Sequence, residues 1–256
     1  MTLDFNHRPS TAERVNALVD AALEAERSAT PARDYLGASR LGHPCERALQ
    51  FEFAHTAEDE GAEFSGQVLR IFEIGHRLED LAIRWLRVAG LDLYTRKGNR
   101  PDGEQFGFSV AGGRIRGHVD GIVAATPAVL GLRTPALWEC KTMNAKNWRD
   151  TVAKGVTLAK PVYAAQIALY QAYMEATAPG ISANPALFTA INKDTAELHH
   201  ELVPFDAELA QRMSDRGVRI LRATDAGALL PRIAASRDFH ECRFCPFAER
   251  CWSLPA

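Results

Sequence analysis

Two carboxylates and a lysine occupy two neighbouring strand-like segments of the chain. Asp120 lies in the segment 117–123, and Glu139 and Lys141 lie in the segment 137–142, which follows a turn-rich stretch. Residues two apart in a strand share a face, so Glu139 and Lys141 point the same way, and a neighbouring strand can bring Asp120 beside them. Such a group binds a hard divalent cation and orients a water beside it, which is the equipment for phosphodiester hydrolysis.

A solvated sheet face that happens to carry an Asp, a Glu and a Lys is the alternative. The flanking residues are apolar, among them Val119, Ile122 and Leu137, which indicates that both segments belong to the core. Charges on core strands are costly unless they are paired or bound to a metal. We therefore favour a functional site, with Trp138 and Cys140 facing the opposite side, into the core.

The elements that must position these residues form a mixed α/β pattern. Apolar spacing and boundary signals predict helices over 10–29, 45–54, 66–88, 161–176 and 205–223. Strand patterns cover 92–97, 106–111, 114–124, 137–141, 186–192 and 197–203. Gly112 and Gly113 predict a two-residue hairpin turn. This order predicts an α/β fold with a mixed central β-sheet flanked by helices rather than a doubly wound parallel sheet.

Length and composition indicate a soluble protein with a sizeable core. The chain has 256 residues, 46% of them hydrophobic, which is enough for one large domain or for one domain with appendages. We expect an N-terminal helical arm at 1–36 and one main domain at 37–256. No apolar run is long enough to cross a bilayer, and the polar N-terminus lacks the apolar region of a signal peptide. A cytoplasmic location without a membrane partner is therefore expected.

The motif G-x-x-D, followed after an interval by E-x-K-T, resembles the PD-(D/E)XK nuclease superfamily in its RecB-like branch. In this sequence it comprises Asp120, Glu139 and Lys141, and Val119 stands where the superfamily name has proline. The resemblance implies that residues 37–256 form a restriction-endonuclease-like nuclease core.

Two further motifs of that branch are matched in the same order. Gln166 and Tyr170 fit its Q-x-x-x-Y motif, and at this spacing they project from one helix face. Upstream, the segment 75–79 resembles the branch's first motif, with His76 in the metal-ligand position. Taken singly, each match also suits an ordinary boundary or partly buried residue, and it is their combination that favours the family.

Cysteines are concentrated near the C-terminus. Cys242, Cys245 and Cys251 form C-x-x-C-x₅-C, a spacing that favours a metal site over disulfides in a cytosolic chain. Cys45 is the natural fourth ligand, because Cys140 is expected to face the core. Such a site would tie the two ends of the nuclease core together.

This arrangement of cysteines resembles the iron–sulfur staple of AddB-type nuclease domains and of CRISPR-associated RecB-like exonucleases. The resemblance implies a [4Fe–4S] cluster on Cys45, Cys242, Cys245 and Cys251. The alternatives are tetrahedral zinc on the same four cysteines and free thiols. His43 or His240 is close enough in sequence to replace one of the thiolates.

The function that the resemblance implies is metal-dependent hydrolysis of DNA, as an exonuclease in DNA processing, recombination or CRISPR adaptation. Its partners would be single-stranded DNA or duplex ends and proteins of those systems, in a cellular or phage setting. The ligands of Mg²⁺ or Mn²⁺ would be His76, Asp120, Glu139 and the carbonyl of Cys140. Lys141 would position the attacking water, and Gln166 and Tyr170 would hold the strand or Lys141 in place.

Two rival functions remain at this point. One is a non-catalytic DNA-binding or assembly module on the same fold. The complete set of Asp120, Glu139 and Lys141 argues against it, because a scaffold does not need all three. The other is a zinc-stabilised structural protein. The net charge of −2 gives no overall attraction for nucleic acid, so DNA binding requires a local basic groove. The candidates for its lining, each equally compatible with solvated surface, are Arg40, Arg47, Lys146, Arg149 and Lys154.

Overall fold

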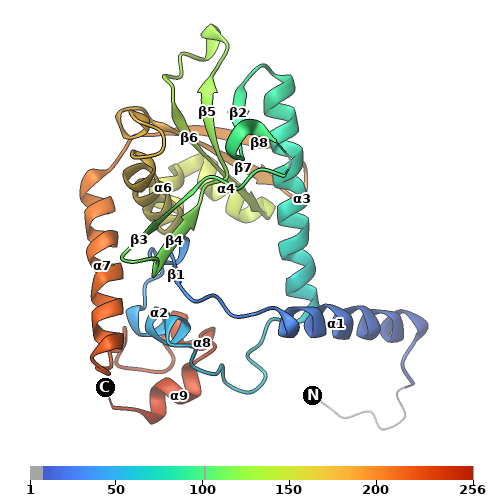
Figure 1. The fold of residues 1–256 in the computed structure, drawn as a ribbon. Helices are drawn as coiled ribbons and strands as arrows, with labels where there is room; N and C mark the ends of the chain where they lie inside the picture. The colour runs from blue at the N-terminus through green and yellow to red at the C-terminus, as the bar shows by residue number, and fades with distance from the viewer. Residues whose placement is uncertain (1–7, 101, 256) are drawn as a thin grey trace.

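A helical arm projects from an α/β body in the structure, a computed structural model that describes residues 8–100 and 102–255 (Figure 1). The arm is α1 (Thr11–Ala29), which begins at a capping box: the Ser10 hydroxyl accepts from the Glu13 N–H at 3.2 Å, and the Glu13 carboxylate accepts from the Ser10 N–H at 2.7 Å. None of its residues is buried. The first seven residues of the predicted arm, 1–36, and the last residue of the predicted main domain lie outside the described residues.

The central sheet has five strands in the order β2-β5-β6-β7-β8. Its strands are β2 (Asp92–Tyr94), β5 (Gly121–Ala125), β6 (Ala136–Met143), β7 (Ala186–Asn192) and β8 (Leu198–Val203). β6 and β7 run parallel and the other neighbours run antiparallel. The mixed sheet that the sequence predicts is therefore confirmed.

A second sheet of three short strands has the order β1-β4-β3. Its strands are β1 (Leu36–Gly37), β3 (Gly107–Val110) and β4 (Ile115–His118). The prediction of one strand over 114–124 is wrong, because β4 and β5 belong to different sheets. Val119, between them, is fully buried and donates its N–H to the carbonyl of Phe106 at 3.0 Å. The chain crosses from one sheet to the other at Val119 and Asp120.

The hairpin between β3 and β4 is present, but its loop is longer than predicted. Val110 pairs with Ile115, so four residues lie between the strands instead of two. Ala111, Gly112 and Gly113 have φ values of 52°, 67° and 87°. Three consecutive left-handed residues explain why the two glycines stand there, since glycine adopts this conformation at little cost.

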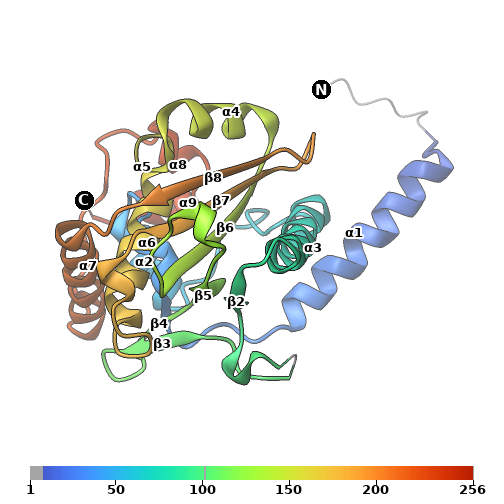
Figure 2. The same ribbon diagram turned by 90° about the horizontal axis from the view of Figure 1, so that it is seen from above.

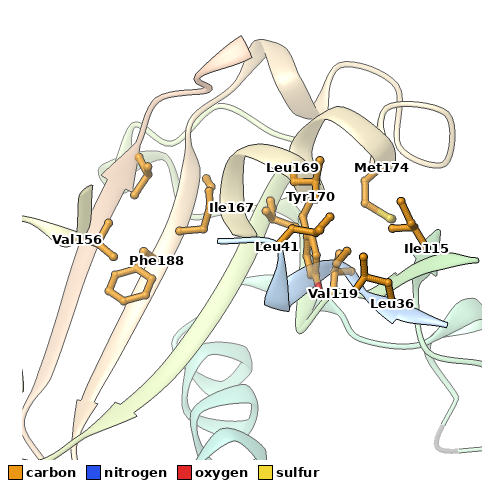
Figure 3. Close-up of a cluster of buried hydrophobic side chains, with 14 of the residues drawn as sticks. Leu36, Leu41, Ile115, Val119, Val156, Ile167, Leu169, Tyr170, Met174 and Phe188 are labelled. Atoms are coloured by element: carbon orange, nitrogen blue, oxygen red, sulfur yellow. The ribbon is translucent and has the colours of Figure 1, made fainter. Parts of the chain in front are cut away.

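Helices cover both faces of the central sheet (Figure 2). On one face lies α3 (Gly66–Val88), which packs on the cluster that includes Trp138 and Cys140. On the other lies α6 (Pro161–Met174), which begins with Pro161 in its first turn and packs against α7 (Ala207–Asp225). Figure 3 shows the core on this side, where Tyr170 extends from α6 towards Val119. These helices agree with the predictions.

Two helices between β6 and α6 escaped prediction. They are α4 (Ala145–Lys154) and α5 (Val156–Ala159). The Asn144 side chain caps α4 by accepting from the Asn147 N–H at 2.9 Å, and Gly155 ends it at a φ of 77°. The remaining short turns of 3₁₀ helix are η1 (Ala38–Arg40), η2 (Lys97–Asn99), η3 (Ala128–Leu130) and η4 (Ile181–Ala183).

Segments from the two ends of the chain meet below the body (Figure 1). They are α2 (Glu46–Phe53), α8 (His240–Arg243) and α9 (Ala248–Ser253). The rings of Phe51 and Phe247 pack edge to face at 5.5 Å. The Asp59 carboxylate accepts from the N–H groups of Glu249 and Arg250 at 2.6 and 3.2 Å, which fastens the 54–65 loop to α9. Across the described residues, no helix is long and apolar enough to span a membrane.

Candidate active site

Strand β6 and the residue that precedes β5 bring Asp120, Glu139 and Lys141 together. β5 pairs with β6 from Gly121 onward, so Asp120 stands next to Glu139 just outside the ladder. Asp120 Oδ2 accepts from the Cys140 N–H at 2.8 Å and lies 4.0 Å from Lys141 Nζ. Lys141 Nζ donates to Glu139 Oε1. The proximity expected from strand register is present, and the catalytic roles of these residues remain predictions.

Glu139 is a fully buried carboxylate with one unsatisfied oxygen. Its Oε1 also accepts from Gln166 Nε2 at 2.5 Å, whereas Oε2 is buried and has no hydrogen-bond partner among the described residues. Burial and the negative charge of Asp120 raise the pKa of Glu139 to about 8, against the opposing effect of Lys141. A divalent cation would satisfy Oε2 and remove the cost of the buried charge. The donor set of this site therefore fits such an ion.

Lys141 is held as a cation. Its side chain is 21% exposed, and Nζ lies 5.5 Å from the centre of the Tyr163 ring. Burial lowers the pKa of Lys141, but Glu139 and Asp120 outweigh it and raise the pKa above its usual range. The group is thus a permanent positive donor rather than a base.

The two residues of the Q-x-x-x-Y motif lie on the site side of α6. Gln166 fixes Glu139 through the hydrogen bond to Oε1. Tyr170 is buried, with its ring edge to face with Phe108 at 5.2 Å. Burial, and then the charge of Glu139, raise the pKa of Tyr170. Gln166 therefore contacts the site directly, whereas Tyr170 forms the apolar wall behind it.

Glu79 is a site residue that the sequence analysis did not single out. On α3, a Cβ placed on Gly75 would lie 3.4 Å from Thr142 Oγ1, and Ala82 is 2% exposed in the core behind β6. Glu79 lies between them on this helix face, so it is directed at β6. Burial and the charge of Asp120 raise the pKa of Glu79 to about 7. A carboxylate within the apolar face of a helix was the signal that could have found it.

His76 lies one turn before Glu79 on α3 and is exposed. The structure shows no hydrogen bond or ion pair from His76 to Asp120 or Glu139 within residues 8–100 and 102–255. Its role as a metal ligand stays a prediction. Glu79 joins it as a second candidate from the same helix.

Replacing Glu79 with glutamine should weaken the pH dependence of stability in the metal-free protein. The pKa of Glu79 rises from 4.5 to about 7 on folding, so between these values the folded state keeps a proton that the unfolded chain releases. Stability therefore falls as pH rises, by about 1 kcal/mol between pH 6 and pH 8 from this residue. Urea unfolding in EDTA at both pH values measures the effect.

The exposed Glu73 on the same helix supplies the control. Glu73→Gln should keep the wild-type fall in stability between pH 6 and pH 8. A Glu79→Gln protein whose pH dependence matches that of Glu73→Gln would contradict the placement of Glu79 beside Asp120.

The four cysteines predicted to share a ligand site line one pocket between α2, α8 and α9. They are Cys45, Cys242, Cys245 and Cys251, all free thiols. Cys140 lies apart in the core behind β6, as expected, and burial raises its pKa. His43 also lines the pocket, and its Nδ1 accepts from the Cys45 N–H at 3.2 Å. The donor chemistry of the pocket fits a thiolate-bound metal group.

Neither the Asp120–Glu139 site nor the cysteine pocket has its side chains in the geometry of a metal site. Among the described residues, no three His, Cys, Asp or Glu side chains form a group spaced to hold a metal ion. The iron–sulfur cluster therefore stays a prediction, which rests on the four cysteines lining one pocket.

Arg47 does not line a DNA groove. It is fully buried, which excludes it from the predicted basic surface. Arg40 pairs with Glu52 at 3.1 Å and Lys154 with Asp150 at 2.6 Å. Lys146 and Arg149 are exposed on α4, directly after β6, and remain candidates for phosphate contact.

Comparison with known proteins identifies the class of protein that this fold and site define. The sequence model of the PD-(D/E)XK nuclease superfamily matches residues 4–252. The chain belongs to the PD-(D/E)XK nuclease superfamily, and it is a nuclease by that membership. A search of the curated proteins finds no match.

Solved structures with the same architecture include SSO0001, at a TM-score of 0.50 and 15% identity over 95% of this chain and 98% of that one. The alkaline exonuclease LHK-Exo from Laribacter hongkongensis gives a TM-score of 0.49 at 15% identity, over 81% of this chain and 93% of that one. Its complex with dAMP gives 0.47 at 16% identity, over 82% and 93%. The likeness to SSO0001 shows a shared fold.

Proposed function

We propose that this chain is a divalent-metal-dependent deoxyribonuclease that acts on DNA ends. The observation that carries the proposal is the Oε2 of Glu139, which is buried beside Asp120 and Lys141 and has no hydrogen-bond partner within residues 8–100 and 102–255. A buried carboxylate oxygen without a partner is costly in a protein of purely structural role. A bound cation would neutralise this oxygen, and the need for such a cation favours a catalytic role over that of a scaffold.

The residues that would hold Mg²⁺ or Mn²⁺ come from strand β6, from the residue before β5 and from helix α3. They are Asp120, Glu139, the carbonyl of Cys140, Glu79 and His76. Held by these residues, such an ion would supply positive charge beside the scissile phosphate and lower the pKa of a water.

Lys141 supplies a fixed positive charge beside Glu139 and Asp120, which would stabilise the negative charge that grows on the phosphate in the transition state. Gln166 keeps Glu139 in its rotamer through the 2.5 Å hydrogen bond. Tyr170 closes the apolar side of the site and limits the access of solvent to Glu139. Orientation and charge stabilisation are thus the work of the protein side chains.

We place the activity in DNA processing, recombination or CRISPR adaptation, in a cytoplasmic or phage setting, as the resemblance to the RecB-like branch suggests. A [4Fe–4S] cluster on the four pocket cysteines would join the N- and C-terminal segments of the nuclease domain. Zinc on the same thiolates is the alternative. The cysteine pocket between α2, α8 and α9 supports either group.

Linear and circular substrates test the preference for ends. Wild-type protein with Mg²⁺ or Mn²⁺ should degrade labelled linear single-stranded and duplex DNA and leave closed circles of the same sequence intact. Cleavage of closed circles at the same rate would make the enzyme an endonuclease. No cleavage of any DNA in either metal would reject the proposed function.

A further inference from the structure

Arg47 is a fully buried arginine at the cysteine pocket. It lies in the first turn of α2, two residues after Cys45. Its Nε donates to the carbonyl of Leu230, and its Nη1 donates to the carbonyl of Pro255 at 3.0 Å and to Cys251 Sγ at 3.8 Å. The guanidinium thus connects the N-terminal cysteine helix to the C-terminal segment.

No carboxylate balances this charge among the described residues. The ion pairs of the structure include Arg216 with Glu46 at 3.3 Å, but none contains Arg47. The Nη2 group of Arg47 is buried and has no hydrogen-bond partner in the same part of the chain. A buried guanidinium without an anion costs several kcal/mol. An anion beside Arg47 is therefore required.

The Cys251 sulfur, 3.8 Å from Nη1, belongs to a set of thiols that can become anionic. Four thiolates outweigh the positive charge of a zinc ion or an iron–sulfur core, so either group would be negative overall. The Cys251 sulfur already accepts from Nη1. Trp252 Nε1 is a second buried N–H at this pocket, and its side chain lies within reach of the Cys242 sulfur. Both donors suit sulfur ligands that carry charge.

We infer that Arg47 is the buried counter-ion of an anionic metal–thiolate group on Cys45, Cys242, Cys245 and Cys251. It is a positioning residue that donates to the Cys251 sulfur and balances the charge of the whole group. The inference rests on the proposed metal group and is independent of DNA cleavage, so the two can fail separately.

Gln50 provides a matched control. It lies one turn further along α2 and is buried, with Nε2 donating to the carbonyl of Ala228 at 2.7 Å and Oε1 accepting from the Leu230 N–H at 2.9 Å. Gln50→Leu therefore removes a tether to the same C-terminal loop without removing a charge. Arg47→Met removes the charge and keeps most of the volume, whereas Arg47→Lys keeps the charge and alters the donor geometry.

The test measures iron, sulfide and zinc per purified chain and the rate at which a chelator removes the metal. Arg47→Met should lose metal at least tenfold faster than wild type, the range for outer residues of metal sites. The rate of metal loss from Arg47→Lys should lie between those of wild type and Arg47→Met, and Gln50→Leu should lose metal at the wild-type rate. If the metal is iron, the reduction potential should become more negative in Arg47→Met, because a nearby cation favours the reduced cluster.

Ala256 lies outside the described residues, so each variant is also made with two glycines added after it. Unchanged results in the extended chains show that a terminal carboxylate is not the anion, as the inference expects. Equal metal retention in Arg47→Met and Gln50→Leu overturns the inference, and so does wild-type protein that contains neither iron nor zinc. Cleavage of linear DNA by that same wild-type sample would leave the proposed nuclease function standing.

Discussion

Replacing Lys141 with alanine is expected to slow DNA cleavage by about a thousandfold or more while metal binding persists. Its ammonium group is the fixed cation of the site, next to Glu139 and 4.0 Å from Asp120 Oδ2. Removing a donor aimed at the charge that forms in the transition state costs about 10²–10³ in rate, and the loss of a full positive charge costs at least as much. Single-turnover cleavage of a labelled oligonucleotide measures the loss.

Lys154→Ala is the control for this prediction. Lys154 is an exposed lysine on α4 that pairs with Asp150, so its loss should leave the rate within a few-fold of wild type. Thermal unfolding in the presence of Mn²⁺ checks that both variants fold. A folded Lys141→Ala protein that cleaves DNA at the wild-type rate would remove Lys141 from the mechanism.

Among the variants considered, replacing a single pocket cysteine is expected to lower the free energy of unfolding most. Cys45→Ala would remove the proposed metal ligand next to α2, and with it the proposed connection to the C-terminal segment, which carries the other three cysteines. In the chain-entropy model, a cross-link over a loop of this length contributes on the order of 5 kcal/mol. The variant should lose its metal, unfold at much lower denaturant concentration and be less soluble.

Cys140→Ala separates this effect from the loss of any buried thiol. Cys140 is buried behind β6, away from the pocket, so its variant should keep the metal and lose only the packing of one sulfur. The metal content and the urea unfolding midpoint are measured for Cys45→Ala and Cys140→Ala. A Cys45→Ala protein with full metal content and an unchanged unfolding midpoint would show that Cys45 is not a ligand.

The sequence was sufficient for much of the fold and for the centre of the site. Alternation along 137–141 predicts that Glu139 and Lys141 share a face, and the buried Trp138 and Cys140 on the other face confirm it. Helix periodicity predicts α3, and the proline at its start indicates α6. These features depend on local spacing, which a single sequence contains.

Other features depend on contacts between segments far apart in the chain. The break between β4 and β5 depends on the burial of Val119 and on the hydrogen bond from its N–H to the carbonyl of Phe106, a contact that the residues around it do not predict. Glu79 belongs to the site because α3 packs over β6. Arg47 resembles a surface cation by type, and only the return of the C-terminal segment buries it. Tertiary packing decides each of these cases.

Metal-dependent cleavage is the most direct measurement of the central claim. Wild type and Lys141→Ala are incubated side by side with labelled linear DNA in Mg²⁺, in Mn²⁺ and in EDTA. We predict product with wild type in at least one metal, none in EDTA and at least a thousandfold less with Lys141→Ala. Equal cleavage by the two proteins, or cleavage by wild type in EDTA, would contradict the metal site at Asp120 and Glu139 and the role of Lys141.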